Sequence, residues 1–335
     1  MNENGRAGQA IAWVKGLDWR VPLALGCTYV FFGSGPAAAG AAIKSLPPFL
    51  MVGVRGLIAG AILTAWALMS GAPRPTRRHW AAGGLIGLLI LTFGAGGGTY
   101  GQLTVPSGIA GVLSALLPLL AACIGYVLFR EKLQARALIG LAIGFAGVAL
   151  LLRPGSDLDG FGVAVIISGQ VAWAFGAELA PRVGLPDDPG LAAGIELLGG
   201  GTVLVVAAAL LGDIGRLDLA SVAWTSWLGF GWFIVIGVAG FTAFGFLAKT
   251  VAPSISTTFS YVNPVVALTL GWLLFSESVS IRMVLATAVI IAGVCLIVST
   301  KSETPSRTRH PFTSGHGYAA HRPAAARPAR TPQAD

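Results

Sequence analysis

The sequence predicts an all-α membrane protein in which ten transmembrane helices form two inverted five-helix repeats. Its composition is the first observation behind this prediction. Hydrophobic residues make up 55% of the chain and charged residues 11%, well below the roughly 25% charged residues of a soluble protein. The chain also contains 47 glycines, and small residues allow helices to pack closely in lipid. The composition therefore excludes an ordinary soluble domain.

The apolar stretches give the number of helices. About twenty apolar residues are needed to cross the hydrocarbon core of a bilayer. Ten such stretches follow one another along the chain: 21–43, 49–69, 80–100, 106–128, 135–152, 161–181, 190–211, 225–247, 254–275 and 280–298. The least distinct boundaries lie between the third and fourth stretches and between the eighth and ninth. Only a few residues separate the members of each of these pairs.

The second five stretches repeat the first five, with an offset of 146 positions between Glu131 and Glu277. An odd number of helices per repeat means that the two copies enter the membrane from opposite sides, as in many transporters. The matched residues are Pro118 with Pro264, Gly125 with Gly271, Phe129 with Phe275, Glu131 with Glu277, Arg136 with Arg282, and Ala146, Gly147 and Val148 with Ala292, Gly293 and Val294.

Lysine and arginine predict the orientation, because cytoplasmic loops are enriched in them. With the N-terminus inside, 17 of these residues fall on inner segments and 4 on outer segments. Both termini are therefore expected in the cytoplasm, and the protein in the cytoplasmic (inner) membrane. The expected organisation is a cytoplasmic segment 1–20, repeats at 21–152 and 161–298, and a disordered basic tail at 299–335.

As a set, several motifs resemble the drug/metabolite transporter superfamily, in particular its ten-helix EamA-type exporters, over residues 21–298. They are Pro118 with Glu131 thirteen residues later, residues 144–148, residues 261–264 with Glu277, residues 292–294, the segment 46–55 and residues 173–176. The resemblance implies that spans 1, 3, 4, 6, 8 and 9 line a central cavity. The chain departs from the family pattern at Phe32, Gly56 and Glu178, which fall on helices expected to face that cavity.

The predicted function is secondary or facilitative transport, in the direction of export, of a small metabolite by alternating access. An amino acid, a related amphiphile or a drug suits a cavity with aromatics and few charges, whereas sugar phosphates would require more Lys and Arg at mid-depth. A membrane scaffold without transport is the alternative. An intramembrane enzyme is disfavoured because all four histidines lie outside the spans and no catalytic constellation falls within them.

The expected partners are a small-molecule substrate and the lipid bilayer. A homodimer is left open. No cofactor, metal or nucleic acid is expected.

Three charged residues lie within spans, where a charge costs about 2.5–3.5 kcal/mol on insertion scales. They are Arg55, Glu178 and Glu196. At about 1.5 Å per residue, Arg55 lies too far in depth from either acid for a direct ion pair. Arg55 and Glu196 occupy mirror-related positions, and bonding to backbone or polar groups is the preferred interpretation for both. Arg55 is also retained as a substrate-binding candidate.

Glu178 is the stronger functional candidate, because Gly35 occupies the aligned position in the first repeat. On a helix it shares a face with Gln170, and Trp173 lies near that stripe. This wall would offer a carboxylate, an amide and an aromatic surface to a substrate. The alternative is an acid that simply reaches water at the cytoplasmic end of its helix.

Aromatic and polar residues complete the predicted substrate-binding set. Each of them, taken singly, could instead fill space or lie in the interfacial belt. They are Tyr29, Phe32, Tyr100, Tyr261 and Asn263, with Trp232 beside them. Glu131 and Glu277, at the ends of spans 4 and 9, are expected to cap the start of the next helix. Pro118 and Pro264 are expected to interrupt their helices at corresponding points.

Overall fold

The computed structural model describes residues 19–130, 133–152, 158–251 and 258–301, and in these residues it is helical with no strand. Eight helices are long and apolar enough to cross a membrane, and two shorter apolar helices, Ala135–Leu151 and Phe259–Phe275, add to them. Together these ten match the ten predicted spans, except that residues 254–257 of the ninth predicted span lie outside the described residues. The predicted fold class is therefore confirmed.

The first repeat contains spans 1 to 5. Its elements are α2 (Arg20–Ala42), α3 (Pro48–Met69), α4 (Arg77–Gly87), η1 (Leu88–Gly96), α5 (Gly97–Gly101), α6 (Ser107–Ser114), α7 (Leu117–Val127) and α8 (Ala135–Leu151). The second repeat contains spans 6 to 10. Its elements are α9 (Gly160–Leu179), η2 (Ala180–Arg182), α10 (Pro189–Leu210), α11 (Asp213–Arg216), α12 (Trp224–Val235), η3 (Ile236–Gly240), α13 (Phe241–Thr250), α15 (Phe259–Phe275) and α16 (Ile281–Lys301).

Proline and aspartate set the starts of several helices. Pro48 and Pro189 stand at the first position of α3 and α10, where the missing N–H would have no partner in any case. The side chain of Asp188 accepts a bond from the Leu191 amide, and Asp159 caps α9 in the same way through Gly162. Such caps satisfy amides that the helix itself leaves without acceptors.

The third helix of each repeat contains a π-helical segment, which the sequence did not predict. In span 3 it is η1, and in span 8 it is η3. Segments of this kind are rare and occur often at functional sites. The two repeats thus share an irregularity of the backbone as well as a sequence pattern.

The prolines of spans 4 and 9 behave differently from the prediction. Span 4 is interrupted after α6, and Pro118 lies at the start of α7. In contrast, α15 continues through Pro264. The expected interruption is therefore present in the first repeat, while the helix of the second repeat tolerates its proline.

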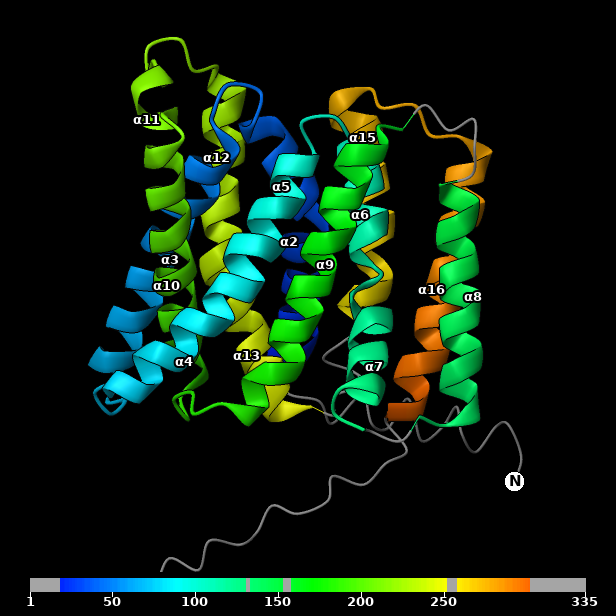
Figure 1. Ribbon diagram of the computed structural model, residues 1–335, viewed down its shortest axis with the longest axis horizontal. Coiled ribbons are helices and arrows are strands. Elements are labelled where there is room, and N and C mark those ends of the chain that lie inside the picture. Colours follow the sequence, from blue (N-terminus) through cyan, green and yellow to red (C-terminus); the bar gives the residue numbers. More distant parts are fainter. Residues whose placement is uncertain (1–18, 131–132, 153–157, 252–257, 302–335) are drawn as a thin grey trace, which may run out of the picture. The chain divides into compact units, whose positions relative to one another are not determined.

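The two repeats interlock through equivalent helices, with α3 against α10 and α8 against α16 (Figure 1). Glycines let these pairs approach at backbone distance. A Cβ on Gly60 of α3 would lie 2.8 Å from the carbonyl oxygen of Gly194, and one on Gly140 of α8 would lie 2.7 Å from that of Gly293. This use of small residues is typical of helices packed in lipid.

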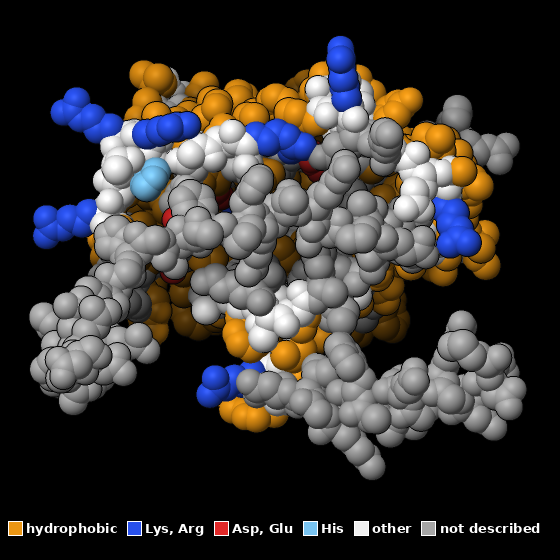
Figure 2. Space-filling view, turned by 90° about the horizontal axis from the view of Figure 1, so that it is seen from below, with side chains coloured by type: hydrophobic (Ala, Val, Ile, Leu, Met, Phe, Trp, Pro, Cys, Tyr) orange, Lys and Arg blue, Asp and Glu red, His pale blue; other side chains and the backbone are white. Residues whose placement is uncertain are grey.

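The inversion of the repeats is visible in the direction of their first helices. In Figure 1, α2 runs upward from the lower end of the bundle, whereas α9 starts at the upper end and runs downward. Figure 2 shows the lower end, where Lys and Arg side chains stand around the rim. The lower end therefore carries the positive charge that the orientation argument assigns to the cytoplasm.

Candidate functional site

An aromatic cluster joins the repeats in the middle of α2. The ring of Phe32 lies 5.7 Å from that of Phe241, 6.2 Å from that of Phe244 and 5.1 Å from that of Phe259, each measured between centroids. Phe32 belongs to the first repeat, and the other three belong to α13 and α15 of the second. We call these four residues the Phe32 cluster. Its edge-to-face contacts are the arrangement that aromatic rings prefer.

Two polar contacts between the repeats lie on the same stretch of α2. The Tyr29 hydroxyl lies 2.7 Å from the Thr258 hydroxyl. The indole N–H of Trp232 donates to the Ser34 hydroxyl at 2.8 Å. Less than two helical turns of α2 therefore carry Tyr29, Phe32 and Ser34, all engaged with the second repeat. The sequence singled out Tyr29, Phe32 and Trp232, but not their partners.

Arg55 lies in another part of the interface between the repeats. Only 5% of its surface is exposed. Its Cζ lies 3.9 Å from the ring centroid of Phe233 on α12, a short cation–π distance. Among the described residues no hydrogen bond or ion pair reaches its guanidinium, and its buried Nε has no partner. The expected bonds to backbone or polar groups are thus absent from the described part of the chain.

Glu196 does not pair with Arg55, as the depth argument predicted. A Cβ built on Gly60 would lie 2.8 Å from the carbonyl oxygen of Gly194 and 2.9 Å from Leu198. Glu196 is therefore level with Gly60, five residues beyond Arg55 on α3. Five residues correspond to about 7–8 Å along a helix. The two charged residues of the α3–α10 pair thus lie at different levels.

The residues predicted to form one wall on α9 have different surroundings in the structure. Gln170 is buried, and Trp173 packs on η1, where a Cβ on Gly94 would lie 3.1 Å from its indole ring. The Glu178 carboxylate lies 3.3 Å from Arg182 one turn later, and Arg182 also stacks on Phe129 at 3.9 Å. Glu178 therefore lies in an ion pair at the end of its helix, with 13% of its side chain exposed, which differs from the water-exposed acid of the alternative interpretation.

The remaining predicted residues are Tyr100, Tyr261 and Asn263, of which Asn263 lies one helical turn from Phe259 of the Phe32 cluster on α15. Tyr100 stacks on Phe49 with centroids 5.3 Å apart, beside a cavity of about 200 Å³ near the start of α9. Tyr261 packs against the hydrophobic core formed largely by α6, α7, α8 and α16. The buried Oδ1 of Asn263 has no hydrogen-bond partner among the described residues.

Glu277 is a cap, but the helix that it caps was predicted wrongly. One oxygen accepts bonds from the Ser107 amide and hydroxyl, both at 2.7 Å, and the other from the Gly108 amide at 2.8 Å. The capped helix is α6 of the first repeat, not the following α16. The inverted packing brings the end of α15 to the start of α6, which chain order alone does not reveal. Its counterpart Glu131 lies outside the described residues.

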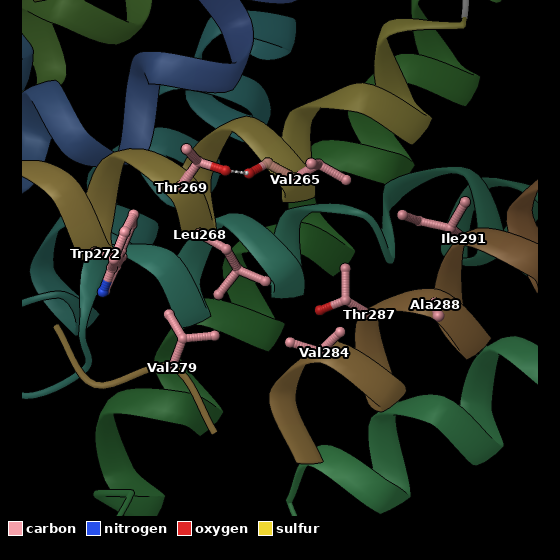
Figure 3. Close-up of a pocket in the computed structure, with 9 residues that line it drawn as sticks. All are labelled: Val265, Leu268, Thr269, Trp272, Val279, Val284, Thr287, Ala288 and Ile291. Atoms are coloured by element: carbon pink, nitrogen blue, oxygen red, sulfur yellow. Dashed lines mark hydrogen bonds between the residues drawn. The ribbon is translucent and has the colours of Figure 1, made fainter. Parts of the chain in front are cut away.

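A groove between α15 and α16 is a different kind of surface. Figure 3 shows this groove of about 480 Å³ between α15 and α16, and none of the predicted site residues lines it. Its hydroxyls bond within their own helices, Thr269 to Val265 and Thr287 to Met283. Trp272 on its rim is 58% exposed. An apolar, open groove with satisfied hydroxyls suits contact with lipid chains rather than a polar substrate.

Comparison with known proteins places this architecture in a family. The sequence pattern of the EamA-like transporter family matches residues 21–153 and 160–299 of this chain. The chain belongs to the EamA-like transporter family. It is thus a multi-pass membrane transporter, and the resemblance seen in the motifs is confirmed.

Relatives of this EamA-like transporter carry related descriptions. The uncharacterized inner membrane transporter YedA of Escherichia coli strain K12 is 36% identical over 289 residues, 85% of this chain and 92% of that protein. The uncharacterized transporter YvbV of Bacillus subtilis is 23% identical over 85% of this chain and 93% of that protein. A probable terminal-alkyne amino-acid exporter of Streptantibioticus cattleyicolor is 24% identical over 64% of this chain and 71% of that protein. A protein of known crystal structure shares the fold, with a TM-score of 0.58 and 20% sequence identity. The match covers 84% of this chain and 98% of that one.

Proposed function

We propose that this EamA-like transporter exports a small metabolite, an amino acid or related amphiphile or a drug, by secondary or facilitated transport through alternating access. The observation that carries the proposal is the set of contacts between the repeats on α2. Tyr29, Phe32 and Ser34 of the first repeat meet Thr258, Phe259 and Trp232 of the second. Transporters with inverted repeats bind substrate near the midplane, at the repeat interface.

The chemistry of this interface fits an amphiphilic substrate. Aromatic rings offer apolar area, and a few hydroxyl and indole groups offer direction. Of the relatives above, one is described as a probable exporter of an amino acid. That description supports the direction of transport and the substrate class proposed here.

Contacts at the upper end of the bundle support alternating access. The Ser45 and Ser226 hydroxyls lie 2.9 Å apart, and Glu277 binds Ser107 and Gly108. Both contacts join one repeat to the other at the end where α2 finishes. With this end outside, as the charge distribution predicts, the conformation is closed toward the exterior. Rocking of one repeat against the other would open it.

The predicted site residues form a proposed set with unequal support. Tyr29, Phe32 and Arg55 lie at the interface of the repeats. Gln170, Trp173 and Glu178 form the α9 side. Asn263 lies one helical turn from Phe259 on α15, and Tyr100 and Tyr261 complete the set. We place the centre of substrate binding beside α2.

A comparison of export tests the proposal. Cells that overexpress the protein and cells that lack it would be grown in the same medium, and metabolites inside and outside would be profiled. We expect one class of small amphiphile to be enriched outside in the first culture. Purified protein in liposomes should then move that compound without hydrolysing ATP. Equal profiles, together with no flux from a broad panel in liposomes, would favour the scaffold, and turnover of a lipid would favour the enzyme.

A further inference from the structure

We propose that Arg55 is the binding point for a carboxylate of the transported molecule, so that the substrate carries a single negative charge at this position. The inference rests on the proposed transport function and specifies its substrate class. It starts from the exceptional position of this side chain. Among the described residues Arg55 is the one charged residue that is buried.

The cost of burying Arg55 requires a compensating partner. A charge within the hydrocarbon region costs several kcal/mol unless it is paired or hydrogen-bonded. A guanidinium has five N–H donors, yet none is used by a described residue, and Nε is buried without a partner. The described protein thus supplies an aromatic face but no acceptor.

The geometry indicates where a ligand would bind. The ring of Phe233 covers one face of the guanidinium at 3.9 Å, which leaves the edge with its N–H groups for an acceptor. A carboxylate fits that edge through two parallel hydrogen bonds. Phe233 is itself 7% exposed, so the contact would form in a desolvated environment, where such bonds are strong.

Helix α12 connects this point to the proposed substrate site. Its Phe233 holds Arg55, and the adjacent Trp232 donates to Ser34 on α2. A substrate that reaches from Arg55 to α2 would place its carboxylate at Arg55 and its apolar part toward α2. A phosphate monoester carries about two negative charges at neutral pH, and no second Lys or Arg is buried among the described residues. A monoanionic carboxylate is therefore the matching group.

Matched ligands provide the binding test. The probes are phenylalanine, 3-phenylpropionate without the amine, phenylethylamine without the carboxylate, and phenylalaninamide, together with the corresponding leucine series. Each would be added to purified protein, and the thermal stabilisation measured as a function of concentration. In the wild type we expect the two acids of at least one series to bind, and the amide of that series to bind at least tenfold more weakly.

Variants of Arg55 test whether this side chain causes the preference for acids over the amide. Arg55→Gln should weaken acid binding at least tenfold and leave binding of the amine within about threefold. Arg55→Lys keeps the charge but loses the planar fork, so it should retain weakened acid binding and report on the site if Arg55→Gln fails to fold. Arg216→Gln, which removes an exposed arginine on α11, is the matched control and should bind acids as the wild type does.

Other outcomes would overturn the inference. Acid binding equal in wild type and Arg55→Gln would do so, and so would no binding of any acid to the wild type. The assay would be repeated with and without phosphatidylglycerol. Stabilisation by this lipid alone, lost in Arg55→Gln, would assign Arg55 to a lipid phosphate instead. In liposomes, flux of amines without acids would overturn the carboxylate site but keep the transporter. Acid binding without any flux would overturn the transport function and keep the site.

Discussion

Arg130 and Ser276 lie 146 positions apart and adopt the same left-handed backbone conformation, with φ of 55° and 53°. They are the non-glycine residues with positive φ in the described part of the chain, and each follows the end of an equivalent helix, α7 or α15. A left-handed residue is a common way to end a helix. The duplication thus extends to the dihedral angles that turn the chain out of spans 4 and 9.

Replacing Ser276 with glycine should stabilise the protein. Glycine adopts φ of about +55° without the Cβ strain of other residues, so we expect a gain of about 0.5–1 kcal/mol in the free energy of unfolding. Ser276→Ala keeps the Cβ and should give no gain. Thermal or denaturant unfolding in detergent would measure both. A gain shared by the two variants would show that the backbone strain is not the cause.

Removing the charge of Glu277 should destabilise the contact between the repeats. Glu277→Gln replaces a carboxylate that accepts three bonds with an amide that has one acceptor oxygen. We expect a loss of about 1–2 kcal/mol in stability, in the range for lost caps and charged hydrogen bonds. Ser107→Ala should cost less, since both amide bonds remain.

A glycine supplies the complementary test of this contact. A Cβ on Gly271 would lie 2.3 Å from the Glu277 carboxylate, so Gly271→Ala should displace it and destabilise the protein by a similar amount. In the Glu277→Gln background the same substitution should add little, because the two changes act on one contact. Fully additive losses, measured by thermal unfolding, would contradict this coupling.

The stability of the start of α9 should depend on pH. The Thr104 hydroxyl and then the Gly162 amide bind the Asp159 carboxylate and lower its pKa from the usual 3.8. A lowered pKa in the folded state contributes stability above the unfolded pKa, and this stability is lost as the pH falls through the folded value. Melting temperatures from pH 6 to pH 3 should therefore drop below about pH 4, and Asp159→Asn should lose this component. Thr104→Val should retain a smaller part of it, and an unchanged acid dependence in Asp159→Asn would contradict the assignment.

The sequence was sufficient for the spans, because their lengths follow from bilayer thickness and their number from the repeat. It was insufficient wherever a contact joins the two repeats. Glu277 was recognised as a cap, yet its partner Ser107 lies 170 positions away. Likewise Tyr29 was selected, but its contact with Thr258 spans 229 positions. The π-helical segments η1 and η3 depend on packing that no local pattern records.

Glu178→Gln tests the α9 side of the proposed substrate site. If the carboxylate exchanges Arg182 for a cationic group of the substrate, loss of the charge should slow transport at least tenfold while the shape is kept. Arg182→Gln removes the neighbouring cation and should leave transport within about twofold. Flux in liposomes for both variants is the measurement. Wild-type flux in Glu178→Gln would assign the residue to an ion pair at the helix end.

Alternating access requires the upper end of the bundle to open, and a disulfide across it should prevent this. Ser45 and Ser226 belong to different repeats, and their hydroxyls lie 2.9 Å apart. Two cysteines at these positions, introduced after Cys27, Cys123 and Cys295 are changed to alanine, can be joined by a mild oxidant. We expect the oxidised double variant to transport at least tenfold more slowly than its reduced form. The single variants Ser45→Cys and Ser226→Cys should respond equally to oxidant and reductant. Full flux in the cross-linked protein would show that transport does not require these helix ends to separate, and would contradict the proposed movement of the repeats.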